Sequence, residues 1–298
     1  MGVLTHVSGH ESARHVYDRT IRLAQAAESA GVESFWVAQH RFGAQRGHLP
    51  SPLVLLGAIA RETGRIRLGT ASIAAPLEDP RRLAEDVAVV DTLSGGRMEL
   101  GLGSGSDPAA SALWGLDHDR RHRRMWEVVD ELRRLFDSGD PDAGTRLVPP
   151  VPGVPSRMWV TAGSAESVAA AAERGIGLIA GRGRVGAEGP AGEDRRAAGL
   201  VDDYRAAGGV RVAISRPVIA TTDPTAVVAA VNRRAREDGS DASGIAIGTP
   251  TEMRQRFDTD PGVMRADLVL IHTRPVEIPL AVEMESIRLL AEEVAARR

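Results

Sequence analysis

Short apolar runs alternate with helix-length segments along the whole 298-residue chain, and this alternation limits the possible folds more than any other feature. The expected strands cover residues 2–7, 34–38, 66–72, 98–104, 158–161, 177–180, 210–220 and 266–272. A segment of helical length follows each of these strands. Eight such repeats with short connections predict an α/β chain that forms a single (β/α)8 TIM barrel over residues 1–298.

The segment 66–106 is the clearest of these repeats. Asp79 and Pro80 are expected to begin its helix, as N-cap and first-turn proline. Its two strands run into Ala71-Ser72 and Gly103-Ser104, which are small residues. Parallel barrel strands bind ligands at their carboxyl ends, so these residues predict a site for a large, flat ligand.

His40 is the candidate catalytic residue. It lies two residues beyond the strand 34–38, in a loop that extends to residue 51. An imidazole with a pKa near neutrality can act as a general base or donate a hydrogen bond at such a rim. A surface histidine is the alternative interpretation, and His48, farther along the loop, is expected to be solvated.

A candidate anion site follows the strand 158–161. Gly163, Ser164 and Ser167 open a helix whose N–H groups, together with the two hydroxyls, could bind a phosphate. Ordinary N-capping by Ser164 explains the same residues equally well. Arg182, two residues past the strand 177–180, could reach the same anion or lie on the surface.

The segment 181–200 is dominated by Gly, Ala and Arg. These residues offer few large apolar side chains for a core, so a flexible loop over about 181–200 is predicted. A loop at this edge of the barrel would be a candidate lid.

Composition excludes several classes of function. The chain contains neither lysine nor cysteine, which excludes Schiff-base aldolases, pyridoxal-phosphate enzymes, P-loop enzymes and thiolate nucleophiles. The net charge of −3 and an aromatic content of 3% favour neither a nucleic-acid nor a membrane partner. Metal binding is not expected, because arginines surround His118 and His122. Without a signal peptide or a spanning apolar run, the chain is expected to be cytoplasmic.

Several motifs together resemble the luciferase-like monooxygenase family of flavin- or deazaflavin-dependent (β/α)8 barrels. They are FWVAQHRF at 35–42, IRLGTAS at 66–72, LAEDVAVVDTLSGGRMELGLGSG at 83–105, AGS at 162–164 and SIRLLAEEV at 286–294. The resemblance covers nearly the whole chain and is weakest across 138–156 and 181–265. It implies a flavin site at the carboxyl ends of the strands.

The resemblance implies a role for each candidate residue. His40 matches the family's active-site histidine, and Ala71-Ser72 matches the strand end beneath the flavin ring, where members often have a cis peptide bond. Gly103 and Ser104 match residues that line the flavin, and Ser164 and Ser167 match phosphate ligands. The chain departs from the pattern at three positions: Gln39 replaces an acidic residue, Ser104 a phosphate-binding arginine and Arg182 a tryptophan.

The resemblance also implies an activity. Gln39 in place of Asp favours FMN over a deazaflavin, so the expected protein is an FMN-dependent monooxygenase that uses reduced flavin and O2 to oxidise a small organic substrate. A separate flavin reductase would supply the reduced FMN, and a homodimer is expected. Two alternatives stay open: a deazaflavin-dependent oxidoreductase that transfers hydride, and a flavin-binding barrel without turnover.

Overall fold

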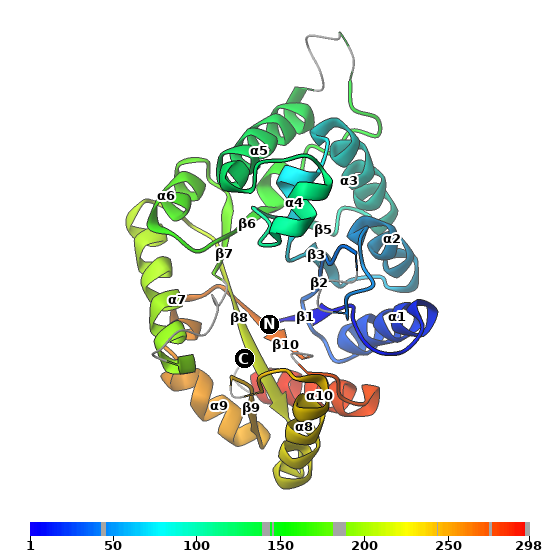
Figure 1. Ribbon diagram of the computed structural model, residues 1–298, viewed down its shortest axis with the longest axis vertical. Helices are drawn as coiled ribbons and strands as arrows, with labels where there is room; N and C mark the ends of the chain where they lie inside the picture. The colour runs from blue at the N-terminus through cyan, green and yellow to red at the C-terminus, as the bar shows by residue number, and fades with distance from the viewer. Residues whose placement is uncertain are drawn as a thin grey trace.

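Eight parallel strands close into a barrel in this computed structural model, within the residues that the structure describes: 1–42, 46–138, 144, 146–180, 189–242, 244–273 and 276–295. The strands of the ring are β1 (Gly2–His6), β2 (Ser34–Ala38), β3 (Arg67–Thr70), β5 (Met98–Gly103), β6 (Met158–Ala162), β7 (Gly177–Ala180), β8 (Val212–Ala220) and β10 (Leu268–His272). They pair in this order, and pairing of β8 with β10 and of β10 with β1 closes the ring (Figure 1). The predicted (β/α)8 TIM barrel is confirmed.

Two short strands extend the carboxyl edge of the ring. Strand β4 (Ile73–Ala74) pairs with β5 immediately after β3 ends, and β9 (Ala246–Gly248) pairs with the long strand β8. Neither was predicted as a separate strand, because each is only two or three residues long. Strand β4 turns the chain along the rim at the point where the ligand was expected.

Helices surround the ring of strands (Figure 1). They are α1 (Ala13–Ser29), α2 (Pro52–Glu62), α3 (Pro80–Ser94), α4 (Pro108–Leu113), α5 (Arg121–Ser138), α6 (Ala165–Glu173), α7 (Gly189–Ala206), α8 (Pro224–Asp238), α9 (Pro250–Thr259) and α10 (Leu280–Ala295). Asp79 caps α3 by accepting hydrogen bonds from Arg81 N and Arg82 N, at 2.9 and 3.0 Å, as predicted. No helix within the described ranges has the length and apolar character that a membrane span requires.

The prediction of a flexible loop over 181–200 is wrong from residue 189 onward, because α7 begins there. The helix is held by its later half, where Ala197, Leu200, Val201 and Tyr204 are buried. Tyr204 also donates a hydrogen bond of 2.7 Å to Ile176 O, ahead of β7. Residues 181–188, including Arg182, lie outside the described residues.

Two tryptophans fill the barrel interior. Trp36 on β2 and Trp159 on β6 meet edge to face with ring centroids 5.9 Å apart. Each faces a glycine on the next strand: a Cβ on Gly69 would lie 2.2 Å from the Trp36 ring, and one on Gly177 would lie 2.4 Å from Trp159. Glycine on the neighbouring strand therefore makes room for a bulky ring inside a barrel of only eight strands.

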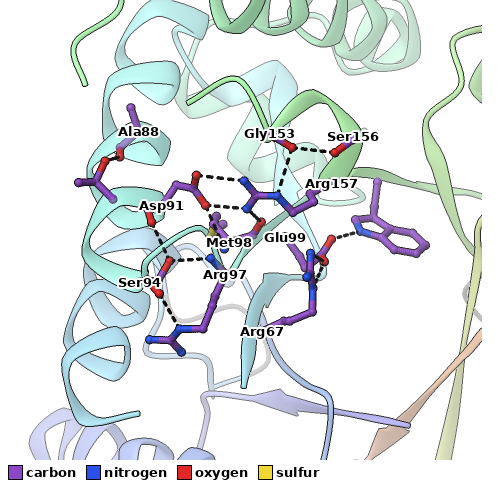
Figure 2. Close-up of polar contacts among 12 residues, drawn as sticks. Arg67, Ala88, Asp91, Ser94, Arg97, Met98, Glu99, Gly153, Ser156 and Arg157 are labelled. Carbon is purple, nitrogen blue, oxygen red and sulfur yellow. Dashed lines mark hydrogen bonds and ion pairs between the residues drawn. The ribbon is translucent and has the colours of Figure 1, made fainter. Parts of the chain in front are cut away.

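A buried ion pair ties α3 to the segment that leads into β6. Arg157 donates two hydrogen bonds to Asp91, at 2.6 and 3.0 Å, and a third to Met98 O at 2.6 Å (Figure 2). Asp91 also accepts a hydrogen bond from Met98 N, at the start of β5. This network fixes the amino ends of two strands whose carboxyl ends border the predicted site.

Candidate functional site

A cleft of about 320 Å³ opens at the carboxyl ends of β2, β5 and β6. It brings together four residues that the sequence predicted for one site, namely His40, Ser72, Gly103 and Ser104. Ala71 is not part of the lining, because it packs against the tryptophan cluster inside the barrel. A volume of this size falls at the lower end of the range for small-molecule sites.

Ser72 and Gly103 form one wall of this cleft. The Ala71–Ser72 peptide bond is cis, as the family resemblance implies. The Ser72 hydroxyl is hydrogen-bonded to the hydroxyl of Thr161 on β6. A Cβ on Gly103 would lie 3.3 Å from Ser72 Cβ and 3.4 Å from its hydroxyl, so glycine keeps this wall open to a flat ligand.

Gln39 connects three segments around the cleft. Its Oε1 accepts a hydrogen bond of 2.8 Å from Ala74 N on β4, while its Nε2 donates to Pro50 O at 3.0 Å and to Glu78 Oε1 at 3.2 Å. An aspartate here could not donate these two bonds and would repel Glu78, which also pairs with Arg41. The departure from the family pattern at Gln39 therefore has a local structural reason.

Three histidines at the ends of neighbouring strands lie side by side, and one of them, His40, lines the cleft. His40 Nε2 lies 3.1 Å from His6 Nδ1, and the His6 ring stacks on His272 with a centroid distance of 4.5 Å. His6 ends β1 and His272 ends β10, on the side of β1 opposite to β2. Neither was predicted from the sequence, although both are histidines at the carboxyl end of a strand, as His40 nearly is.

Burial alters the protonation of the His6 and His40 rings. Burial, and then the neighbouring His272 and His40, hold the pKa of His6 well below the ordinary histidine value, and burial lowers the pKa of His40. Both rings are therefore neutral at pH 7 in the folded chain. The unfolded chain begins to protonate them as the pH falls through about 6.5, so the folded state loses stability as the pH falls below that value.

We expect the free energy of unfolding to decrease between about pH 7 and pH 5, by at most about 1.4 kcal/mol per pH unit for each ring. Urea denaturation of the wild type and of His6→Asn at several pH values checks this. The variant lacks the contribution of His6, so its unfolding free energy should depend less steeply on pH. Equal slopes in the two proteins would contradict the assignment.

The predicted anion site, formed by Gly163, Ser164 and Ser167, follows the carboxyl end of β6. These three residues do not line the cleft. Ser164 caps α6 by accepting from Ser167 N at 3.3 Å, and its hydroxyl lies 3.2 Å from that of Ser167. Arg196 of α7 donates to Gly163 O at 3.1 Å and brings a guanidinium to this helix terminus. Sequence reasoning missed Arg196, because it assigned that segment to a loop.

One group of residues has the spacing of metal ligands in the part of the chain that the structure describes. It consists of His10, Asp238 and Glu277. Asp238 already pairs with Arg46 at 2.9 Å and with Arg234 at 3.1 Å, and Arg234 also pairs with Glu277. The guanidinium groups of Arg46 and Arg234 therefore already supply the positive charge that a metal ion would bring to these three residues. None of the three lines the cleft.

Comparison with known sequences places this chain in a family. The sequence profile of luciferase-like monooxygenases matches residues 1–267. A 4-hydroxyprotoasukamycin monooxygenase from Streptomyces nodosus subsp. asukaensis is 35% identical over 123 residues, which are 41% of this chain and 33% of that protein. The chain spans about half the length, or less, of the curated relatives that it matches.

Solved structures show the same fold over the whole chain. Monooxygenase RslO1 from Streptomyces bottropensis superposes with a TM-score of 0.83 at 23% identity and 99% coverage of both chains. The oxygenating constituent of 3,6-diketocamphane monooxygenase from Pseudomonas putida, solved with FMN, gives 0.76 at 18% identity and covers 100% and 98%. A coenzyme F420 dependent tetrahydromethanopterin reductase from Methanopyrus kandleri gives 0.69 at 17% identity and covers 100% and 98%.

The profile match includes β1 to β9 and ends at the residue before β10. It therefore contains His40 and Ser72, which follow β2 and β3, and Gly103, which ends β5, together with the helix that Ser164 caps. This chain belongs to the luciferase-like monooxygenase family.

Proposed function

We propose that this protein is an FMN-dependent monooxygenase that uses reduced flavin and O2 to oxidise a small organic substrate. The observation that carries the proposal is the single cleft in which Ser72, Gly103 and His40 meet. Reduced FMN, when bound, supplies the electrons that activate O2. A separate reductase would deliver it, and we also propose a homodimer.

The residues of the cleft fit a flavin ring. Gly103 leaves space that any side chain would fill, and Ser72 with Thr161 presents hydroxyl groups along the same wall. At the α6 N-terminus, Ser164 and Ser167 would hold the phosphate, because free N–H groups and the helix dipole favour an anion there. Arg196 would add a positive charge beside Gly163.

His40 is the residue of the cleft best suited to move a proton. Its lowered pKa keeps the ring neutral at pH 7, so one ring nitrogen carries a lone pair that can accept a proton from a bound substrate. Gly47 packs on this ring, since a Cβ there would lie 2.5 Å from His40 Cγ. The imidazole is thus held in place by the loop in which it lies.

Anaerobic titration with reduced FMN and, separately, with a reduced deazaflavin tests the choice of cofactor. We expect reduced FMN to bind more tightly. Tighter binding of the deazaflavin would favour hydride transfer and contradict the proposal.

Gly103→Val should weaken reduced-FMN binding about tenfold or more, because the valine methyl groups would enter the cleft. Gly64→Val is the matched control: a Cβ at Gly64 meets nothing within 4 Å, and this residue lies outside the cleft lining. Fluorescence or calorimetric titration measures both dissociation constants. Equal affinity in the Gly103→Val variant and the wild type would place the flavin elsewhere.

A further inference from the structure

Three histidine rings form a row across the ends of β2, β1 and β10. In this order they belong to His40, His6 and His272, and the row starts at the cleft. His40 lines the cleft, whereas His6 and His272 do not. His6 touches both of the others, through the 3.1 Å contact with His40 Nε2 and by stacking on His272. His6 is therefore placed to control the protonation of His40 without touching a bound molecule.

The contacts of His40 distinguish its two ring nitrogens. Nε2 is hydrogen-bonded to His6 Nδ1. Within the described residues, Nδ1 of His40 makes no hydrogen bond, and it is absent from the set of buried polar atoms that lack a partner. Nδ1 is thus the nitrogen left for a bound molecule.

We propose that His6 is a positioning residue that accepts a hydrogen bond from His40 Nε2–H and so leaves His40 Nδ1 as the proton acceptor of the active site. The proposal rests on the proposed function for the use of that acceptor, but the tautomer is a property of the unliganded protein. In this arrangement both rings carry their proton on Nε2, which is the more stable tautomer of a free histidine side chain.

A hydrogen on the bound substrate leaves as a proton, its bonding electron pair stays on the substrate atom, and an N–H bond forms at His40 Nδ1. His40 becomes an imidazolium, and its Nε2–H bond to His6 becomes charge-assisted and stronger. His6 thereby stabilises the protonated form of His40 and raises the pKa of the ring relative to one without this acceptor.

His6 can serve as acceptor only while its Nδ1 is unprotonated. Burial, and then the rings of His272 on β10 and His40, lower the pKa of His6 and preserve that lone pair at neutral pH. The charged residues that line the cleft are Arg41, which pairs with Glu78 behind the lining, and Asp107. Neither His6 nor His40 hydrogen-bonds a carboxylate in the described part of the chain, so His6 is the group that sets the tautomer of His40.

Nitrogen-15 NMR of the histidine-labelled protein, without flavin, tests the proposal directly. The signals of His40 are assigned by their loss in His40→Ala. We expect His40 in the wild type to show a protonated Nε2 and an unprotonated Nδ1 at pH 7. A protonated Nδ1 would overturn the proposal, whatever the activity of the protein.

Two substitutions of His6 extend the test. His6→Phe keeps an aromatic ring to stack on His272 but removes the acceptor, so the pKa of His40 should fall by about one unit and the Nε2–H tautomer should lose its dominance. His6→Asn places a carbonyl oxygen near the position of Nδ1 and should restore both properties. An unchanged His40 titration in His6→Phe would overturn the proposal, and circular dichroism verifies that each variant folds.

This design separates the two proposals. If reduced FMN fails to bind but the NMR results are as expected, the proposed function fails and the role of His6 stands. If reduced FMN binds but His40 carries its proton on Nδ1, the proposed role of His6 is wrong and the proposed function stands.

Discussion

Replacing His40 with alanine is expected to lower the rate of substrate oxidation by about 10²–10⁴-fold, which is the usual contribution of a general acid or base. His40 is the histidine that lines the cleft, and its ring is neutral at pH 7. Binding of reduced FMN should change much less, because Ser72, Gly103 and the α6 terminus stay in place. Oxygen uptake with reduced FMN and product analysis, on a substrate found by screening small organic compounds, measure this loss.

His48→Ala is the matched control for this experiment. His48 belongs to the same loop but bonds to Gly9 O at 3.0 Å and is not part of the cleft lining. Its removal should leave turnover within about threefold of the wild type, well below the loss expected for a catalytic group. Unchanged oxygen-dependent turnover in His40→Ala would support a flavin-binding barrel in which this histidine has no chemical role.

Arg157→Met is expected to lower the free energy of unfolding by about 3–5 kcal/mol, because it leaves the Asp91 carboxylate buried without its cation. The side chains of Arg157 and Asp91 are only 13% and 7% exposed. Asp91 would keep a single hydrogen bond from Met98 N. Urea denaturation at neutral pH, with two-state behaviour verified, measures the loss.

Arg174→Met is the matched control, because Arg174 also makes two hydrogen bonds to one aspartate, Asp130, at 2.8 and 3.0 Å. That pair is far more exposed, at 26% and 50% of the two side chains. Its loss should cost about 0–1 kcal/mol, since water solvates the remaining carboxylate. Similar losses in the two variants would show that burial of Asp91 is not what makes its ion pair important.

The site could be predicted from sequence wherever it depends on the carboxyl ends of strands. His40, Ser72, Gly103 and Ser104 follow apolar runs, and closure of a parallel barrel must bring such ends to one rim. The N-cap of α3 at Asp79 could be predicted for a different reason, because its hydrogen bonds are local. Local chemistry and barrel topology together account for the positions of these residues.

Four residues contribute to the candidate site through contacts between segments that are distant in sequence. They are His6, His272, Arg196 and Gln39. His6 and His272 are 266 positions apart, and their stacking follows from the pairing of β1 with β10. Helix α7 has a low proportion of large apolar residues, and its stability comes from tertiary burial of Leu200, Val201 and Tyr204. Composition alone therefore predicted a loop, and the prediction omitted the arginine that the helix brings to Gly163.

The structure of the complex with FMN tests the central claim, that one flavin spans the cleft and the α6 terminus. A crystal of the protein soaked with FMN would show this directly. We expect the flavin ring to lie against Ser72 and Gly103, with the phosphate at Ser164 and Ser167. A flavin ring outside the cleft, or a phosphate away from the α6 N-terminus, would contradict it.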